Sequence, residues 1–272
     1  MTNNIRLKKS LGQNFLLSNA IAKKLVNSAN IALNDVVVEV GPGKGIITDI
    51  LLQKTNRVVA VEKDERMVEY LKEKFSREVL SEKLILVHED ILNFSPQNWK
   101  LEIGNWKLIG AIPYYITGAF LRKFLSVHEQ PKTIAVIIQK EVAERIIAKK
   151  DKPLDSARGK ESVLSISVKA YGEPHYIQTV SRKLFSPEPR VDSAIISIKN
   201  ISKMFFDGVS EEVFFNMIRA GFGSKRKKLI NNIKIIPKDK LKNILQDLKI
   251  SEYIRAEDIT LPYWKKIIQK ID

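Results

Sequence analysis

The sequence has no cysteine and only three histidines in 272 residues. Without cysteine there can be no disulfide bond, thiolate zinc site or thiol nucleophile, and a reducing cytoplasm suits such a chain. The histidines His88, His128 and His175 are far apart and lack the short spacings of a metal site, so we assign them no role. We therefore expect no metal in the function.

Long apolar runs are missing as well. No stretch approaches the roughly 18 apolar residues that a membrane-spanning helix needs. Residues 1–9 contain neither the apolar core of a signal peptide nor an evident amphipathic presequence. We expect a cytoplasmic protein, acting as a monomer without a membrane partner.

Acidic residues are few relative to basic ones: 31 Asp and Glu stand against 46 Lys and Arg, a formal net charge of +15. Such a balance favours a polyanionic partner, most simply nucleic acid, although heavy lysine use by the source organism is an alternative. Clusters of cations suit phosphate contacts, which position a nucleic acid without reading its sequence. Alternatively, each cluster is only a solvated part of the surface and binds no phosphate. The candidate RNA-binding residues are Arg6, Lys8, Lys9, Lys225, Arg226, Lys227 and Lys228, the last four opening a predicted helix, and Lys149, Lys150 and Lys152 form a further loop-like group.

Apolar runs alternate with helical periodicity through the first half of the chain, the order βαβα. This order predicts an α/β fold, a mostly parallel sheet with helices on both faces. Two later runs, Tyr176–Val180 and Ser193–Lys199, predict an antiparallel pair at the sheet edge. The other predicted strands are Val36–Val40, Arg57–Glu62, Leu84–Val87, Lys107–Ile112 and Thr133–Gln139, and the predicted helices are Ala20–Ala29, Ile46–Gln53, Glu65–Lys74 and Gly118–Leu125.

The pattern changes near residue 200, where short amphipathic helices replace the alternation. We predict two domains, residues 1–200 with the sheet and residues 201–272 as a small all-α domain, whose basic residues make it the candidate RNA-binding domain if the polyanionic partner is RNA. The predicted helices of the second domain are Glu211–Ala220, Lys225–Ile233, Lys238–Leu248 and Pro262–Ile271.

A glycine-rich turn follows the first apolar run, with Gly41, Gly43 and Gly45 at every second position. Glycine lets the backbone take positive φ and approach a ligand closely. A dinucleotide fingerprint would place its third glycine at position 46, which is Ile46, so an NAD site is disfavoured. The shorter spacing, with the acid Glu39 two residues before Gly41, suits S-adenosylmethionine.

Carboxylates follow the next two predicted strands. Glu62 ends the second strand, 21 residues after Gly41, and Asp90 follows the third. Because parallel strands end at one edge of the sheet, both acids should face one crevice, where they could accept hydrogen bonds from a ribose and an adenine amino group. A helix N-cap is the alternative for an acid in such a place, and Asp64 fits that role.

Five segments occur in the order of a known family: Lys8 to Leu16, the glycine turn, Ile112 to Tyr114, Phe185 to Ala194 and Phe222 to Leu229. Together they resemble the rRNA adenine dimethyltransferase family over essentially the whole chain, above all its bacterial kasugamycin-resistance branch. That branch dimethylates two adjacent adenosines near the 3′ end of 16S, the small-subunit, rRNA during ribosome biogenesis. The resemblance implies a Rossmann-like class I fold, S-adenosylmethionine as cofactor, and an immature 30S particle as partner.

The resemblance also implies residue roles. On the cofactor side, Asn14 and Leu16 would contact the methionine end, Gly41 would approach through its backbone, and Glu62 and Asp90 would hold ribose and adenine. On the target side, Tyr114 would stack on the adenine, which must leave its own stack to reach the site. Pro113 would stiffen the segment that begins at Ile112, and Phe185 would pack on the other face of the base.

One position departs from the family pattern. Ala111 stands where the family has Asn, both in the cofactor site and in the catalytic motif, so a side-chain acceptor for the target amino group is absent. Ala at this position could be an introduced, inactivating substitution, or it could reflect natural loss of activity. We favour the first because the other motif residues are retained. The alternative function is an inactive rRNA-binding ribosome-assembly factor. An organellar transcription factor on the same fold is disfavoured because no acidic or extended tail is present.

Overall fold

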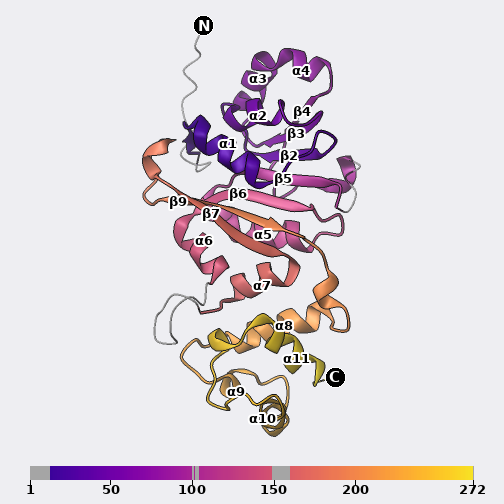
Figure 1. Ribbon diagram of the computed structural model, residues 1–272, viewed down its shortest axis with the longest axis vertical. Coiled ribbons are helices and arrows are strands. Elements are labelled where there is room, and N and C mark those ends of the chain that lie inside the picture. Colours follow the sequence, from indigo (N-terminus) through magenta and orange to yellow (C-terminus); the bar gives the residue numbers. More distant parts are fainter. Residues whose placement is uncertain (1–12, 100, 102–103, 149–159, 272) are drawn as a thin grey trace. The chain divides into compact units, whose positions relative to one another are not determined.

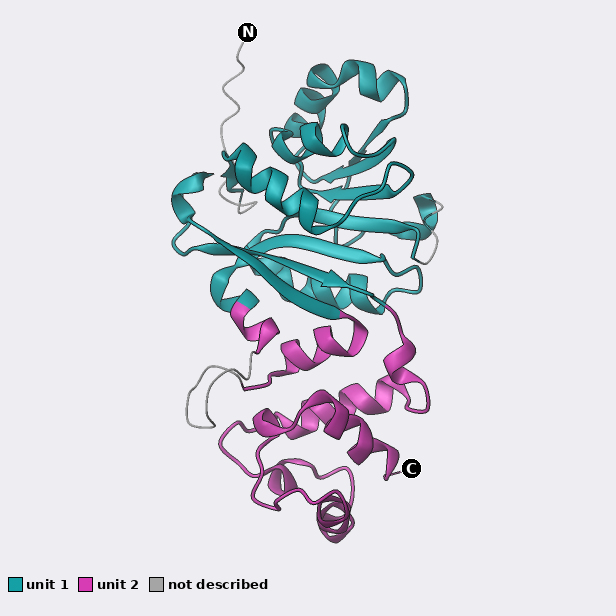
Figure 2. Ribbon diagram, in the orientation of Figure 1, with its two compact units in different colours: residues 1–143, 173–201 teal, residues 144–172, 202–272 magenta. Residues whose placement is uncertain are grey.

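The computed structural model describes residues 13–99, 101, 104–148 and 160–271. They form two compact units, one with residues 1–143 and 173–201, the other with 144–172 and 202–272 (Figure 2). This grouping differs from the predicted division at residue 200 mainly in residues 144–172. The physical reason is that Ile166 and Ala170 of that segment are buried in the hydrophobic core of the second unit.

A seven-stranded sheet organises the first unit, in the order β4-β3-β2-β5-β6-β9-β7 (Figure 1). Strands β2 to β6 pair in parallel, whereas β9 pairs antiparallel with both β6 and β7 at one edge. The predicted parallel sheet and antiparallel edge pair are therefore confirmed. The strands are β2 (Val36–Val40), β3 (Arg57–Glu62), β4 (Leu84–His88), β5 (Trp106–Ala111), β6 (Thr133–Gln139), β7 (Glu173–Val180) and β9 (Ser193–Lys199), and a separate short pair joins β1 (Phe15–Leu16) to β8 (Phe185–Ser186).

Helices cover both faces of the sheet, as its apolar strands require. Alternate strand residues such as Val37 and Ile109 share one core with α1 and α2. The strand residues on the other face include Trp106, whose ring packs edge-on against Phe124 of α5 with 6.2 Å between the ring centroids. The helices of this region are α1 (Asn19–Ser28), α2 (Ile46–Leu51), α3 (Glu65–Lys74), α4 (Ser76–Leu80), α5 (Thr117–Ser126) and α6 (Lys140–Ile147), the last crossing the boundary between the units.

Side-chain caps fix where several helices begin. Asp64 accepts a hydrogen bond from the backbone N–H of Arg66 and is the N-cap of α3, the role predicted for it. Ser18 caps α1 in the same way. Ser162 and Ser165 form a reciprocal capping box at the start of α7 (Val163–Tyr171).

The second unit is helical and packs around Trp264, which is fully buried. Its helices, besides α7, are α8 (Glu211–Gly221), α9 (Leu229–Asn232), α10 (Lys238–Asp247) and α11 (Leu261–Gln269). The predicted helix Lys225–Ile233 is wrong at its start, because residues 225–228 form a turn before α9. Asn232 holds this turn through its side-chain amide, which donates to the carbonyls of Gly221 and Ser224.

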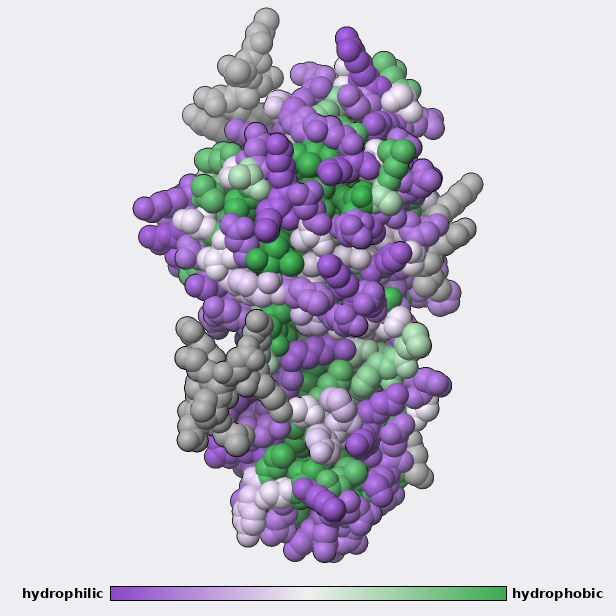
Figure 3. All heavy atoms as spheres, viewed as in Figure 1, coloured by the Kyte–Doolittle hydropathy of each residue, from purple (hydrophilic) through white to green (hydrophobic). Residues whose placement is uncertain are grey.

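Hydrophilic residues predominate on the face drawn in Figure 3, and apolar side chains show between them. In the part of the chain that the structure describes, no helix is both long and apolar enough to cross a bilayer.

Candidate active site

One pocket of the first unit lies where the parallel strands end. Strands β2, β3 and β5 each contribute their last residue or the turn that follows, and the segment after β4 contributes Glu89 and Asp90. The pocket gathers every predicted cofactor and target residue: Asn14, Leu16, Gly41, Glu62, Asp90, Ala111, Ile112, Pro113, Tyr114 and Phe185. Segments that are remote in the sequence thus meet in one cavity.

The glycine turn between β2 and α2 needs its glycines. Gly41, Gly43 and Gly45 have φ of 61°, 54° and 79°, which disfavour any other residue. A Cβ on Gly43 would lie 2.7 Å from the Phe15 ring, so that glycine also lets the amino-terminal motif pack on the turn. A Cβ on Gly41 would meet nothing within 4 Å, so its backbone borders open space in the pocket where a ligand can approach.

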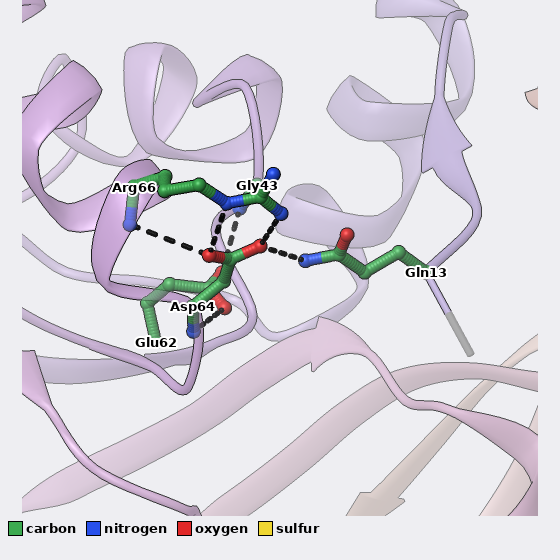
Figure 4. Close-up of polar contacts among 5 residues, drawn as sticks. All are labelled: Gln13, Gly43, Glu62, Asp64 and Arg66. Carbon is green, nitrogen blue, oxygen red and sulfur yellow. Dashed lines mark hydrogen bonds and ion pairs between the residues drawn. The ribbon is translucent and has the colours of Figure 1, made fainter. Parts of the chain in front are cut away.

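Glu62 is buried at the end of β3, and both of its carboxylate oxygens accept backbone hydrogen bonds (Figure 4). Oε1 accepts from the N–H of Asp64 at 2.9 Å, and Oε2 accepts from the N–H of Gly43 at 3.3 Å. Burial raises the pKa of Glu62, and these hydrogen bonds oppose the shift. Because each carboxylate oxygen has two lone pairs, Glu62 retains the capacity to accept from a ribose.

Asp64 lies between Arg66 and Gln13 in the same network (Figure 4). Arg66 donates from Nε to Oδ1 at 2.9 Å and from Nη2 to Oδ2 at 2.5 Å, and this guanidinium lowers the pKa of Asp64 to about 2. Gln13 Nε2 donates to Oδ2 at 3.2 Å. Asp64, ionised at neutral pH, therefore ties Gln13 to the end of β3.

Asp90 lies two residues beyond β4 and is held from two sides. Its Oδ1 accepts from the N–H of Leu92 at 2.9 Å, and its Oδ2 pairs with Lys63 Nζ at 2.7 Å. Partial burial acts to raise the pKa of Asp90, but these two contacts outweigh it and lower the pKa. Asp90 is therefore a fixed carboxylate at the pocket wall.

The segment after β5 presents the aromatic ring of the site. Ile112 continues the pairing with β6 by donating from its N–H to the carbonyl of Ile137 at 3.0 Å. Pro113 follows, and Tyr114 begins a short 3-10 helix. The Tyr114 hydroxyl lies 2.7 Å from the hydroxyl of Ser193, the first residue of β9. Ala111 contributes only a methyl group where the predicted motif needs a polar one.

The remaining predicted residues lie outside this pocket. Arg6, Lys8, Lys9 and the group Lys149, Lys150 and Lys152 are outside the described residues. Lys225, Arg226, Lys227 and Lys228 are exposed in the turn before α9, in the second unit. Lys228 Nζ lies 3.9 Å from the centroid of the Tyr253 ring, so this lysine has an aromatic partner.

The pocket residues that were not predicted from the sequence include Gln13, Lys63 and Ser193, which contact Asp64, Asp90 and Tyr114 respectively. Each is adjacent in sequence to a residue that was singled out, or lies in a quoted motif. Their partners are 27 to 79 residues away, so only the folded structure brings the pairs together.

A family model described as ribosomal RNA adenine dimethylase matches residues 4–272. The chain belongs to this family. A ribosomal RNA small subunit methyltransferase A from Dehalococcoides mccartyi is 37% identical over 266 residues, covering 97% of this chain and 88% of the relative. A protein of the same name from Fusobacterium nucleatum is 36% identical and covers 96% of each chain.

A solved structure described as a dimethyladenosine transferase from Plasmodium falciparum superposes with a TM-score of 0.76 at 22% identity, covering 93% of this chain and 95% of that one. This likeness concerns the fold, and it confirms the predicted Rossmann-like methyltransferase architecture. Family and fold together imply S-adenosylmethionine as the methyl donor. The pocket fits that group, because open space adjoins Gly41 and two fixed carboxylates line the wall.

Proposed function

We propose that the pocket binds S-adenosylmethionine and a flipped adenine, and that the chain belongs to the branch that dimethylates two adjacent adenosines near the 3′ end of small-subunit rRNA. The observation that carries the proposal is the meeting of the glycine turn, Glu62, Asp90 and the segment Ile112 to Tyr114 in one cavity. The names of the relatives in Dehalococcoides mccartyi and Fusobacterium nucleatum support the choice of substrate. The chain would act in the cytoplasm, as a monomer, on an immature small subunit.

Each side of the pocket has a separate task. S-adenosylmethionine, when bound, supplies an activated methyl group. Glu62 would accept hydrogen bonds from the ribose hydroxyls, Asp90 would accept from the cofactor's adenine amino group, and Gly41 would allow close approach of the backbone. Asn14 and Leu16 would contact the methionine end, in a segment held by the contact of Gln13 with Asp64.

The target base requires a platform and hydrogen-bond acceptors. The ring of Tyr114 is half-buried and supplies the platform, and stacking on an aromatic ring contributes about 1–3 kcal/mol per base. The adenine N6 lone pair is delocalised into the ring, so acceptors must draw on both amino hydrogens to make N6 a nucleophile. Backbone carbonyls of the segment 111–113 supply one acceptor. With Ala111 the second acceptor is missing, and catalysis is impaired.

Ala111 also favours a second candidate, an rRNA-binding assembly factor without catalysis. Both candidates use the same pocket and the same cationic residues, Lys225 to Lys228. They differ only in whether the protein transfers methyl groups. The deciding experiment measures methyl transfer from labelled S-adenosylmethionine to immature small subunits, with this chain and with the Ala111→Asn variant. If only the Ala111→Asn variant transfers methyl groups, the result supports the first candidate, a methyltransferase impaired by Ala111. No transfer by either protein, with RNA binding intact, supports the assembly factor.

A further inference from the structure

Ser193 is a fully buried residue whose hydroxyl contacts the proposed target site. It begins β9, where it pairs with Gln139 of β6 and with Val180 of β7. Its Oγ lies 2.7 Å from the Oη of Tyr114, 79 residues earlier in the chain, and both residues line the pocket. The first residue of β9, paired with a strand on each side, therefore holds the hydroxyl end of the Tyr114 ring.

Tyr114 needs such support because of where it stands. It follows Pro113 at the start of a short 3-10 helix and is only partly buried, so surrounding side chains do not enclose it fully. Rotation about the Cα–Cβ bond would carry the ring away from a stacked base. A hydrogen bond at the far end of the ring fixes that rotation, and a neutral bond of this kind shifts an equilibrium by about fivefold.

We propose that Ser193 is a positioning residue for the target base: it holds the Tyr114 ring in the orientation that stacks on the flipped adenine. The inference rests on the proposed function, since it assumes that Tyr114 is the platform. Ser193 touches neither reacting atom in this scheme and acts only through Tyr114.

The same strand provides a matched control. Ser197 is also fully buried in β9, and its hydroxyl donates to the backbone carbonyl of Ser28 at 3.1 Å. It does not line the pocket. Removing either hydroxyl deletes one partly buried hydrogen bond, so a general loss of stability would appear in both variants, whereas a loss of ring orientation would appear only in Ser193→Ala.

The test uses the full chain and a short rRNA hairpin with 2-aminopurine at the target adenine. Emission of the bound probe reports stacking, because an aromatic platform quenches it. We compare the unaltered chain with Ser193→Ala, Tyr114→Phe, their double variant, Ser197→Ala and Tyr114→Ala. Thermal unfolding and affinity for S-adenosylhomocysteine are measured for each, and neither property should separate Ser193→Ala from Ser197→Ala.

We expect Ser193→Ala and Tyr114→Phe each to raise the ratio of unstacked to stacked probe by about fivefold, because each deletes the same hydrogen bond and keeps the ring. The double variant should add little to either single change. If Ser193→Ala does not fold, Tyr114→Phe carries the test alone, since its altered atom lies in the pocket.

Two results would overturn the proposal. The first is that Tyr114→Ala raises emission while Ser193→Ala and Tyr114→Phe leave it unchanged. This result would keep Tyr114 as the stacking platform and reject the role of Ser193. The second is unchanged emission in Tyr114→Ala itself, which would reject the target-base site and the positioning role together.

Discussion

The hydroxyl of Thr48 donates to Oε2 of Glu39 at 2.7 Å, and both side chains are fully buried on either side of the glycine turn. The other oxygen of Glu39, Oε1, has no hydrogen-bond partner among the described residues. Burial, helped by the nearby charges of Glu62 and Asp49 and opposed by the hydrogen bond from Thr48, raises the pKa of Glu39 from the usual 4.5 to about 8. At neutral pH the folded protein therefore holds a proton on Glu39.

This proton predicts a pH dependence of stability. Between about pH 4.5 and 8 the unfolded chain releases the Glu39 proton and the folded chain keeps it, so the free energy of unfolding falls as pH rises and levels off above about 8. Glu39→Gln should flatten this fall, because glutamine is neutral in both states. Urea unfolding across this range measures it, with Glu65→Gln as the exposed control. A fall of equal size in Glu39→Gln would contradict the assignment.

Glu62→Gln should weaken cofactor binding by about 10- to 100-fold, because it removes charge-assisted hydrogen bonds to the ribose. Glutamine keeps the shape and one acceptor oxygen, so it can still accept from one of the backbone N–H groups of Gly43 and Asp64. Calorimetry with S-adenosylhomocysteine measures the affinity, and the matched control is Glu65→Gln, an exposed acid in the first turn of α3. Equal affinities in all three proteins would refute the ribose role, and preferential binding of NAD would refute the choice of cofactor.

Gly110→Ala should destabilise the sheet beneath the pocket. A Cβ at this position would collide with the carbonyl oxygen of Val40 on the neighbouring strand β2, and backbone cannot move aside cheaply. Gly118→Ala in α5 is the control, since its Cβ meets nothing within 4 Å and alanine favours a helix by about 1 kcal/mol over glycine. In chemical unfolding, the free energy of unfolding should be lower than the parent's for Gly110→Ala and higher for Gly118→Ala. A Gly110→Ala protein as stable as the parent would show that β2 and β5 can part at little cost.

The sequence predicted the fold closely where the local pattern and the tertiary environment agree. The bounds of Val36–Val40, Glu65–Lys74 and Ser193–Lys199 are as predicted, because β-branched residues in buried strands and a capped amphipathic helix each specify their own structure. The ten predicted site residues that line the pocket could be found from motifs, since strand ends of a parallel sheet meet at one edge.

The rest depends on contacts that no local pattern encodes. Lys225 to Lys228 form a turn because Asn232 binds the carbonyls of Gly221 and Ser224, which a helical pattern in residues 225–233 cannot reveal. The contact between Tyr114 and Ser193 likewise depends on β9 lying beside β6.

The turn at Lys225 to Lys228 predicts a salt effect on RNA binding. Replacing Lys225 and Lys227 with Gln should lower the slope of log affinity against log salt by about 1 to 2, because each phosphate contact releases a counterion. Lys23 and Lys24, exposed on α1, provide a control with the same change in charge. Filter binding of a small-subunit rRNA fragment at several salt concentrations gives the slopes. Equal slopes for both double variants would mean that residues 225–228 are only a solvated surface.

Ala111→Asn should raise single-turnover methylation by about 100-fold or more, by analogy with the loss of one preorganised polar group from an active site. The substitution restores a side-chain acceptor at the end of β5, where Ala111 lines the pocket. Affinity for S-adenosylhomocysteine and for RNA should change little, because Glu62, Asp90 and Tyr114 are untouched. Rapid-quench measurements with saturating enzyme separate the chemical step from binding. Ala111→Ser is the control, since a hydroxyl is polar but reaches less far than an amide, and it should recover only part of the rate. Equal rates for the Ala and Asn proteins would show that the backbone carbonyl suffices, and that position 111 contributes nothing to the transfer.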